Sequence, residues 1–131
     1  MEVKINDGGR SKYFAASKVG DCVTRAVAIA TNKDYKDVYN EITSIVGYTP
    51  RNGVKKKDTK RIMAHFGGVW HPCMAVGSGC QVHLKTDELP KGKLVCSCSG
   101  HVVAVIDGVL NDTYDSSRNE TRCVYGYWVF G

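Results

Sequence analysis

The stretch HVVAVIDGVLND, residues 101–112, indicates the fold more clearly than any other part of the sequence. Two β-branched, apolar runs flank Asp107-Gly108, which is a strong signal for a two-residue turn between antiparallel strands. Counting back from that turn, with side chains alternating between the two faces of each strand, makes Asp112 a diagonal neighbour of His101 on one face. Asn111 lies on the opposite face, and a slip of one residue in register would exchange Asn111 and Asp112.

Further strands are expected around this hairpin. Runs rich in β-branched and aromatic residues, with turn signals between them, predict strands at 69–71, 94–98, 101–106, 109–114 and 124–130. Near the start, alternation at Val3 and Ile5 and the turn signal Asp7-Gly8-Gly9 predict a short hairpin within residues 1–14. The second half of the chain is therefore expected to form an antiparallel sheet.

The first half of the chain favours helices instead. An apolar, alanine-rich run at 22–30 predicts a buried helix with Asp21 at its N-cap. Apolar residues recur at helical spacing over 34–46 and again over 58–66. We predict a single domain, residues 1–131, of the α+β class, in which N-terminal helices pack on a C-terminal antiparallel sheet.

Positive charge is concentrated in one stretch. The formal net charge is +5, and much of it comes from a basic run made of Arg51, Lys55, Lys56, Lys57, Lys60 and Arg61. Such a run occurs in proteins that bind nucleic acid or an acidic protein partner, but it is more often a solvated loop and first helical turn. No apolar run approaches the roughly 18 residues of a membrane span, so no membrane partner is expected.

The six cysteines leave two interpretations open. Their even number is compatible with disulfides, but the chain starts with Met1-Glu2-Val3-Lys4 and shows no apolar region of a secretory signal. We therefore expect a reducing, cytoplasmic compartment and free thiols. A structural zinc site is the alternative, built from some of His71, Cys73, Cys80, His83, Cys96, Cys98 and His101. Their spacing matches no common zinc-finger pattern, so we expect neither a metal nor another cofactor.

Three residues together predict a nucleophilic site. Cys22 falls in the first turn of a predicted helix, where unpaired N–H groups and the helix dipole stabilise a thiolate. His101 opens a strand and would serve as the base, and Asp112 would orient its ring, with Asn111 as the alternative orienter. Each residue also has a plain structural explanation: a small buried thiol, a core or surface histidine, and a residue of the polar turn region 111–117.

These motifs resemble those of a known family. Gly20-Asp21-Cys22 before a buried helix, and much later Gly100-His101 with the hairpin to Asp112, are similar to the papain-like cysteine peptidase superfamily. The likeness is greatest to its bacteriocin-leader-processing branch and to small phage-encoded proteins of this type. The resemblance implies that Cys22 is the nucleophile, His101 the general base and Asp112 the orienter.

The sequence departs from this family before the cysteine. Papain-like enzymes usually carry a glutamine about six residues earlier as an oxyanion donor, and Ala16 stands there, with Ser17 as the candidate substitute. We predict a thiol hydrolase, a cysteine peptidase or amidase, that acts on a peptide or protein substrate through an acyl-enzyme. The alternatives are a catalytically weak or inactive binding protein of the same fold, with nucleic acid or an acidic protein as its partner, and a zinc-stabilised binding module.

Overall fold

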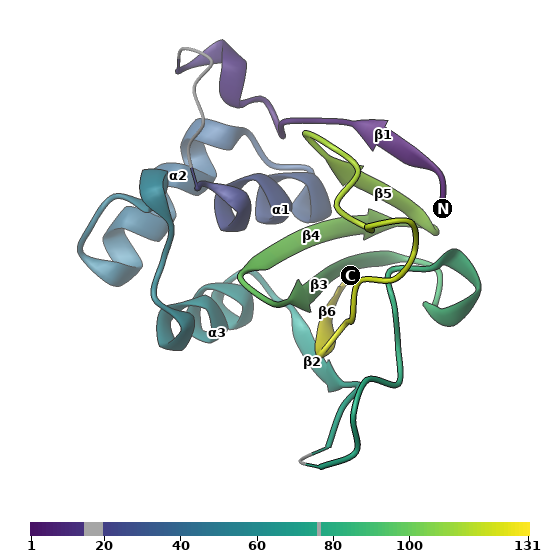
Figure 1. Ribbon diagram of the computed structural model, residues 1–131. Helices are drawn as coiled ribbons and strands as arrows, with labels where there is room; N and C mark the ends of the chain where they lie inside the picture. The colour runs from purple at the N-terminus through teal and green to yellow at the C-terminus, as the bar shows by residue number, and fades with distance from the viewer. Residues whose placement is uncertain (15–19, 76) are drawn as a thin grey trace.

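The computed structural model describes residues 1–14, 20–75 and 77–131, which form three α-helices and one six-stranded mixed sheet (Figure 1). The helices are α1 (Cys22–Thr31), α2 (Tyr35–Val46) and α3 (Lys56–His65). The strands are β1 (Val3–Ile5), β2 (Val69–Pro72), β3 (Lys93–Cys98), β4 (His101–Ile106), β5 (Val109–Asp112) and β6 (Gly126–Phe130). The predicted α+β class is confirmed, and the predicted helices and strands lie within a few residues of the observed ones.

Local chemistry explains where the helices begin and end. The carboxylate of Asp34 accepts hydrogen bonds from the N–H groups of Lys36 and Asp37, which caps the start of α2. Gly47 follows the helix with a φ of 81°, a conformation that glycine adopts without strain, and its N–H bonds back to Thr43. α1 is shorter and buried along almost its whole length, as expected from its apolar sequence.

The sheet has the order β1-β5-β4-β3-β6-β2, and one of its pairings differs from the prediction. β1 pairs with β5 in parallel, so the sheet is mixed rather than antiparallel. The hairpin predicted for residues 1–14 is wrong. The Asp7 carboxylate accepts from the N–H groups of Gly9 and Ser11, which supports a 3₁₀ turn there and leaves β1 free to complete the edge of β5.

Two cores lie on the two faces of the sheet. The helices gather on one side of the sheet in Figure 1, and their apolar side chains pack against Val95, Val102, Ala104, Trp128 and Phe130. On the other face, Leu94, Val103, Val105 and Leu110 are covered by Leu84, Leu89 and Val124. These three covering residues come from connecting segments rather than helices, so one face of the sheet is closed by irregular backbone.

The structure differs from a second expectation, that all six cysteines are free thiols. Cys80 and Cys123 form a disulfide, while Cys22, Cys73, Cys96 and Cys98 are free. The expectation of six free thiols is therefore wrong for two of them. The β-bridge between His83 and Cys123 brings the two connecting segments together, although 43 positions separate the cysteines in sequence. The cytoplasmic location stays a prediction.

None of the described helices is both long and apolar enough to cross a membrane.

Candidate active site

Cys22 is the first residue of α1, as the sequence predicted, but the residue before it does not cap the helix with its side chain. Asp21 occupies the N-cap position, and its carboxylate accepts instead from Tyr35 Oη at 2.6 Å, from Arg10 at 3.3 Å and from Arg25. The Cys22 thiol thus lies at the positive end of α1, and the Asp21 carboxylate at the N-cap bonds to other side chains rather than to the N–H groups of the helix.

His101 and Asp112 are in direct contact. The Nε2 atom of His101 lies 2.7 Å from Oδ2 of Asp112, a distance typical of a charge-assisted hydrogen bond. The β4–β5 register matches the turn-based count, since Ile106 pairs with Val109. Asn111, the alternative orienter, accepts a hydrogen bond from Asn6 instead. The choice of Asp112 over Asn111 as the neighbour of His101 is confirmed.

Asp112 is held by several donors at once. Ser116 Oγ donates to Oδ2 at 2.7 Å, and the N–H of Thr113 donates to Oδ1 at 2.7 Å. Arg25 adds an ion pair with Oδ1 at 3.5 Å. The side chain of Asp112 is only 3% exposed, so these partners supply what water would otherwise provide. The loop carrying Ser116 is tied down by Arg122, which donates to the carbonyls of Ser116 and Ser99.

The Cys22 thiol lines the same cleft as His101, and the ring lowers the pKa of the thiol. Burial raises the pKa of the Cys22 thiol, but hydrogen bonding to His101 and to the N–H of Val102 lowers it, and the charges of His101 and Arg25 lower it further. The net pKa of Cys22 lies below its ordinary value. Because Nε2 of His101 is engaged by Asp112, Nδ1 is the ring nitrogen left for the thiol.

The pKa of His101 is shifted in the opposite direction, upward. Burial lowers the pKa of His101, but the hydrogen bonds to Asp112 and Cys22 and the charges of both residues raise it to about 9. For Asp112, burial raises the pKa, while the hydrogen bonds from His101, Ser116 and Thr113 bring it below its usual value. Both directions favour the charged pair of thiolate and imidazolium over the neutral pair, and the thiolate is the reactive form of a cysteine nucleophile.

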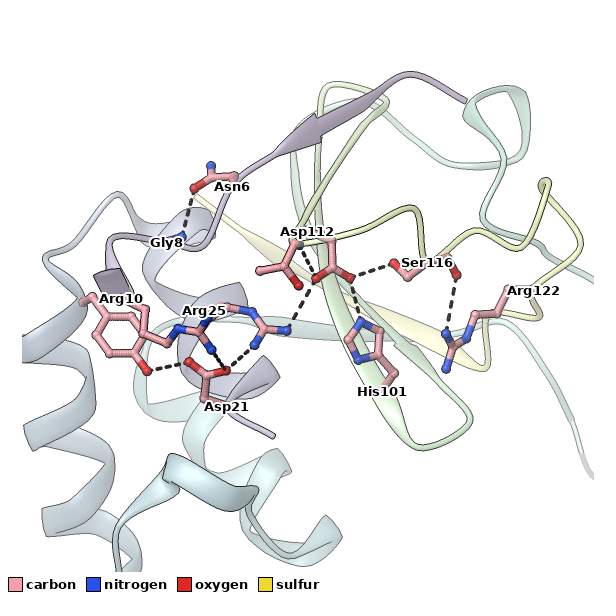
Figure 2. Close-up of polar contacts among 11 residues, drawn as sticks. Asn6, Gly8, Arg10, Asp21, Arg25, His101, Asp112, Ser116 and Arg122 are labelled. Atoms are coloured by element: carbon pink, nitrogen blue, oxygen red, sulfur yellow. Dashed lines mark hydrogen bonds and ion pairs between the residues drawn. The ribbon is translucent and has the colours of Figure 1, made fainter. Parts of the chain in front are cut away.

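A chain of buried charges extends behind the site (Figure 2). Positive and negative side chains alternate along it, and each forms an ion pair with the next, in the order Arg10, Asp21, Arg25, Asp112 and His101. Sequence reasoning missed Arg10 and Arg25. The spacing of Asp21 and Arg25, four residues apart at the start of a helix, was a signal for their pairing, but nothing local indicated that Arg25 reaches Asp112.

An open cleft of about 1420 Å³ contains the candidate nucleophile and base. Cys22 and His101 line it, together with Tyr114, whose ring centroid is 5.9 Å from that of His101. One part of its wall is aromatic and apolar and consists of Trp70, Pro72, Met74, Tyr125 and Trp128. Trp70 is 40% exposed, so it is not only a core residue of the sheet. Lys56 and Lys60 of the basic run also line the cleft.

Other predicted residues lie elsewhere. Ala16 and Ser17, the positions considered for an oxyanion donor, fall outside the described residues. Over residues 1–14, 20–75 and 77–131, no three His, Cys, Asp or Glu side chains form a group that could hold a metal ion. Of the candidate zinc ligands, Cys80 is in the disulfide and Cys96 is buried in the core. His71 stacks on Tyr127, with the ring centroids 5.5 Å apart.

We compared the chain with protein-family models, with curated proteins and with solved structures, and none of the three comparisons found a match. We therefore infer the function from the geometry of the site.

Proposed function

We propose that this protein is a thiol hydrolase, a cysteine peptidase or amidase, in which Cys22 is the nucleophile, His101 the general base and acid, and Asp112 the group that orients the ring. The arrangement of a helix-start cysteine and a histidine-to-aspartate hairpin is similar to that of papain-like peptidases. The observation that carries the proposal is the short His101–Asp112 hydrogen bond on a ring that lines the same cleft as Cys22 and lowers the pKa of its thiol. An ordinary buried cysteine would have its pKa raised by its surroundings, as Cys96 does.

The reaction follows from the positions of these groups. The Cys22 thiolate attacks the carbonyl carbon of an amide, and a C–S bond forms as the carbonyl oxygen becomes an oxyanion. His101 then gives its proton to the leaving amine as the C–N bond breaks, which leaves an acyl-enzyme. A water molecule attacks the thioester, His101 takes its proton, and the C–S bond breaks to release a carboxylic acid and the thiolate.

Oxyanion stabilisation is expected from the start of α1. The N–H of Cys22 belongs to the first turn of the helix, where backbone N–H groups have no partner within the helix. A single donor gives a slower enzyme than a pair, since loss of one donor typically costs about 10²- to 10³-fold in rate. We therefore expect low turnover unless a second donor joins the site when the substrate binds.

The test is a comparison of thiol reactivities within one protein. Limiting iodoacetamide at pH 6.5, followed by peptide mapping, is expected to label Cys22 before Cys73 or Cys98, because burial raises the pKa of both other thiols. His101→Ala is expected to slow the labelling of Cys22 by at least about tenfold, since the thiolate loses its cationic partner. Equal rates at Cys22 and Cys73, unchanged by His101→Ala, would rule out an activated nucleophile and favour a binding protein of the same fold.

A further inference from the structure

We propose that the cleft selects acidic peptides: its substrate is a peptide segment that places carboxylates against Lys56 and Lys60 and an apolar side chain against Trp70 and Met74. This inference rests on the proposed function, because it names the substrate of the same site. It comes from the distribution of charge and apolar surface along the cleft wall rather than from Cys22 or His101.

The lysines form one cationic edge. Lys56 and Lys60 are four residues apart on α3, so they lie on the same face of the helix, and both are exposed and line the cleft. Neither has an ion-pair partner among the described residues. Two unpaired cations on one side of a substrate cleft are available to a ligand.

Nothing on the described part of the wall competes for these cations. No Asp or Glu side chain from the described residues lines the cleft. The acidic residue of α3, Asp58, is held by Tyr48 Oη at 2.6 Å and by Arg61 at 3.2 Å. The other cations in the lining are already paired, Arg10 and Arg25 with Asp21, and the His101 imidazolium with Asp112. The unbalanced charge facing the cleft is therefore positive and belongs to the two lysines.

The β2–β6 part of the wall supplies the apolar contact. Trp70 and Trp128 are cross-strand neighbours with ring centroids 4.5 Å apart, and Trp128 is buried while Trp70 is 40% exposed. Met74, 38% exposed, continues this surface. An aliphatic or aromatic side chain that packed here would cover exposed apolar area, and an unbranched methionine adapts to its shape.

The same distribution argues against nucleic acid as the ligand. The basic run is divided: Arg61 pairs with Asp58, Lys55 lies over the Tyr48 ring, and only two of the six cations line the cleft. A single-strand binder needs a charged track along several phosphates combined with stacking platforms. Two lysines match two carboxylates of a short acidic peptide better than they match a phosphate backbone.

The experiment measures binding without turnover. Cys22→Ala protein is titrated by calorimetry with three acetylated, amidated decapeptides built from leucine, glycine and two charge positions that hold glutamate, glutamine or lysine. At low salt the glutamate peptide is expected to bind about fivefold to thirtyfold tighter than the glutamine peptide, as two partly exposed ion pairs would give. Lys56→Gln with Lys60→Gln is expected to abolish this preference.

The matched control removes two lysines that do not line the cleft. Lys57→Gln with Lys91→Gln changes the net charge equally and is expected to keep the preference. Equal binding of the glutamate and glutamine peptides, or an equal loss in both double variants, overturns the proposal. A 12-nucleotide oligo-dT that binds tighter than the glutamate peptide, through Lys56 and Lys60, overturns it in favour of nucleic acid.

The peptide-binding test and the thiol-labelling test of the proposed function can fail independently of each other. An unactivated Cys22 together with glutamate-selective binding would overturn the hydrolase and support the selectivity of the cleft. An activated Cys22 without selectivity would do the reverse.

Discussion

Arg25 is the residue whose removal most directly tests the buried charge chain. Its side chain is 8% exposed and contacts Asp21 and Asp112, which are themselves 0% and 3% exposed. Replacing Arg25 by methionine keeps much of the volume but leaves two buried carboxylates with one cation fewer. Removal of one partner from a buried ion pair typically costs about 3–5 kcal/mol, because the remaining charge stays buried.

The structure places the expected loss at the low end of that range. Asp21 keeps Arg10 and Tyr35 as partners, and Asp112 keeps His101 and the donors beside it. We therefore expect Arg25→Met to lower the free energy of unfolding by about 3 kcal/mol. For a domain of this size that corresponds to roughly 10 °C in the melting temperature. Arg25 also lowers the pKa of Cys22, so labelling of the thiol at pH 6.5 is expected to slow in the same variant.

Thermal and urea unfolding followed by circular dichroism measures the first effect, with Arg61→Met as the matched control. Arg61 also pairs with an aspartate, Asp58, but its side chain is 61% exposed, so water replaces the lost partner and a much smaller loss is expected. A melting temperature for Arg25→Met within 2 or 3 °C of that of Arg61→Met (about 1 kcal/mol at most) would refute the reasoning that the buried chain stabilises the fold.

Three further predictions concern the site and the disulfide. Asp112→Asn is expected to slow Cys22 labelling less than His101→Ala does, because it acts through the ring rather than on the thiol; an equal loss would contradict this. The raised pKa of His101, about 9, keeps the imidazolium protonated below that pH, so kcat/KM is expected to fall as pH rises through about 9 and not near 6.5. Replacing Cys80 and Cys123 by serine is expected to destabilise the protein by about 2–4 kcal/mol, measured by urea unfolding, because the bridge closes a long loop; no change would show that the bridge is dispensable.

The sequence predicted the elements that depend on local patterns. The helices at 22–30, 34–46 and 58–66 follow from apolar spacing, and the hairpin at Asp107-Gly108 follows from turn chemistry, which also placed Asp112 beside His101. The errors involve partners far apart in the chain. The parallel β1–β5 pairing joins strands separated by about a hundred residues, and the sequence of residues 1–14 does not indicate that its strand pairs with β5.

The same distinction between local and long-range features applies to the candidate site. Cys22 and His101 were predicted from helix-start and strand-start positions, and Asp112 from the count through the Asp107-Gly108 turn, which are all local features. The Cys80–Cys123 bridge was missed because cysteine spacing alone does not give connectivity. The contact of Arg25 with Asp112 depends on how α1 packs against β4 and β5, and an arginine in an apolar helix gave no indication of its partner.

Asp112 links the stability of the fold to the chemistry of the thiol. One of its oxygens faces Arg25 at 3.5 Å, and the other accepts from His101 at 2.7 Å, so its charge acts more strongly on the imidazole than on the guanidinium. A buried carboxylate compensated mainly by the ring favours the protonated ring, and the protonated ring in turn favours the thiolate of Cys22. The donors from Ser116 and Thr113 keep the carboxylate ionised, while Arg25 holds it against α1. The contacts of Asp112 that join α1 to the sheet therefore also favour the protonated His101 ring on which the proposed reaction depends.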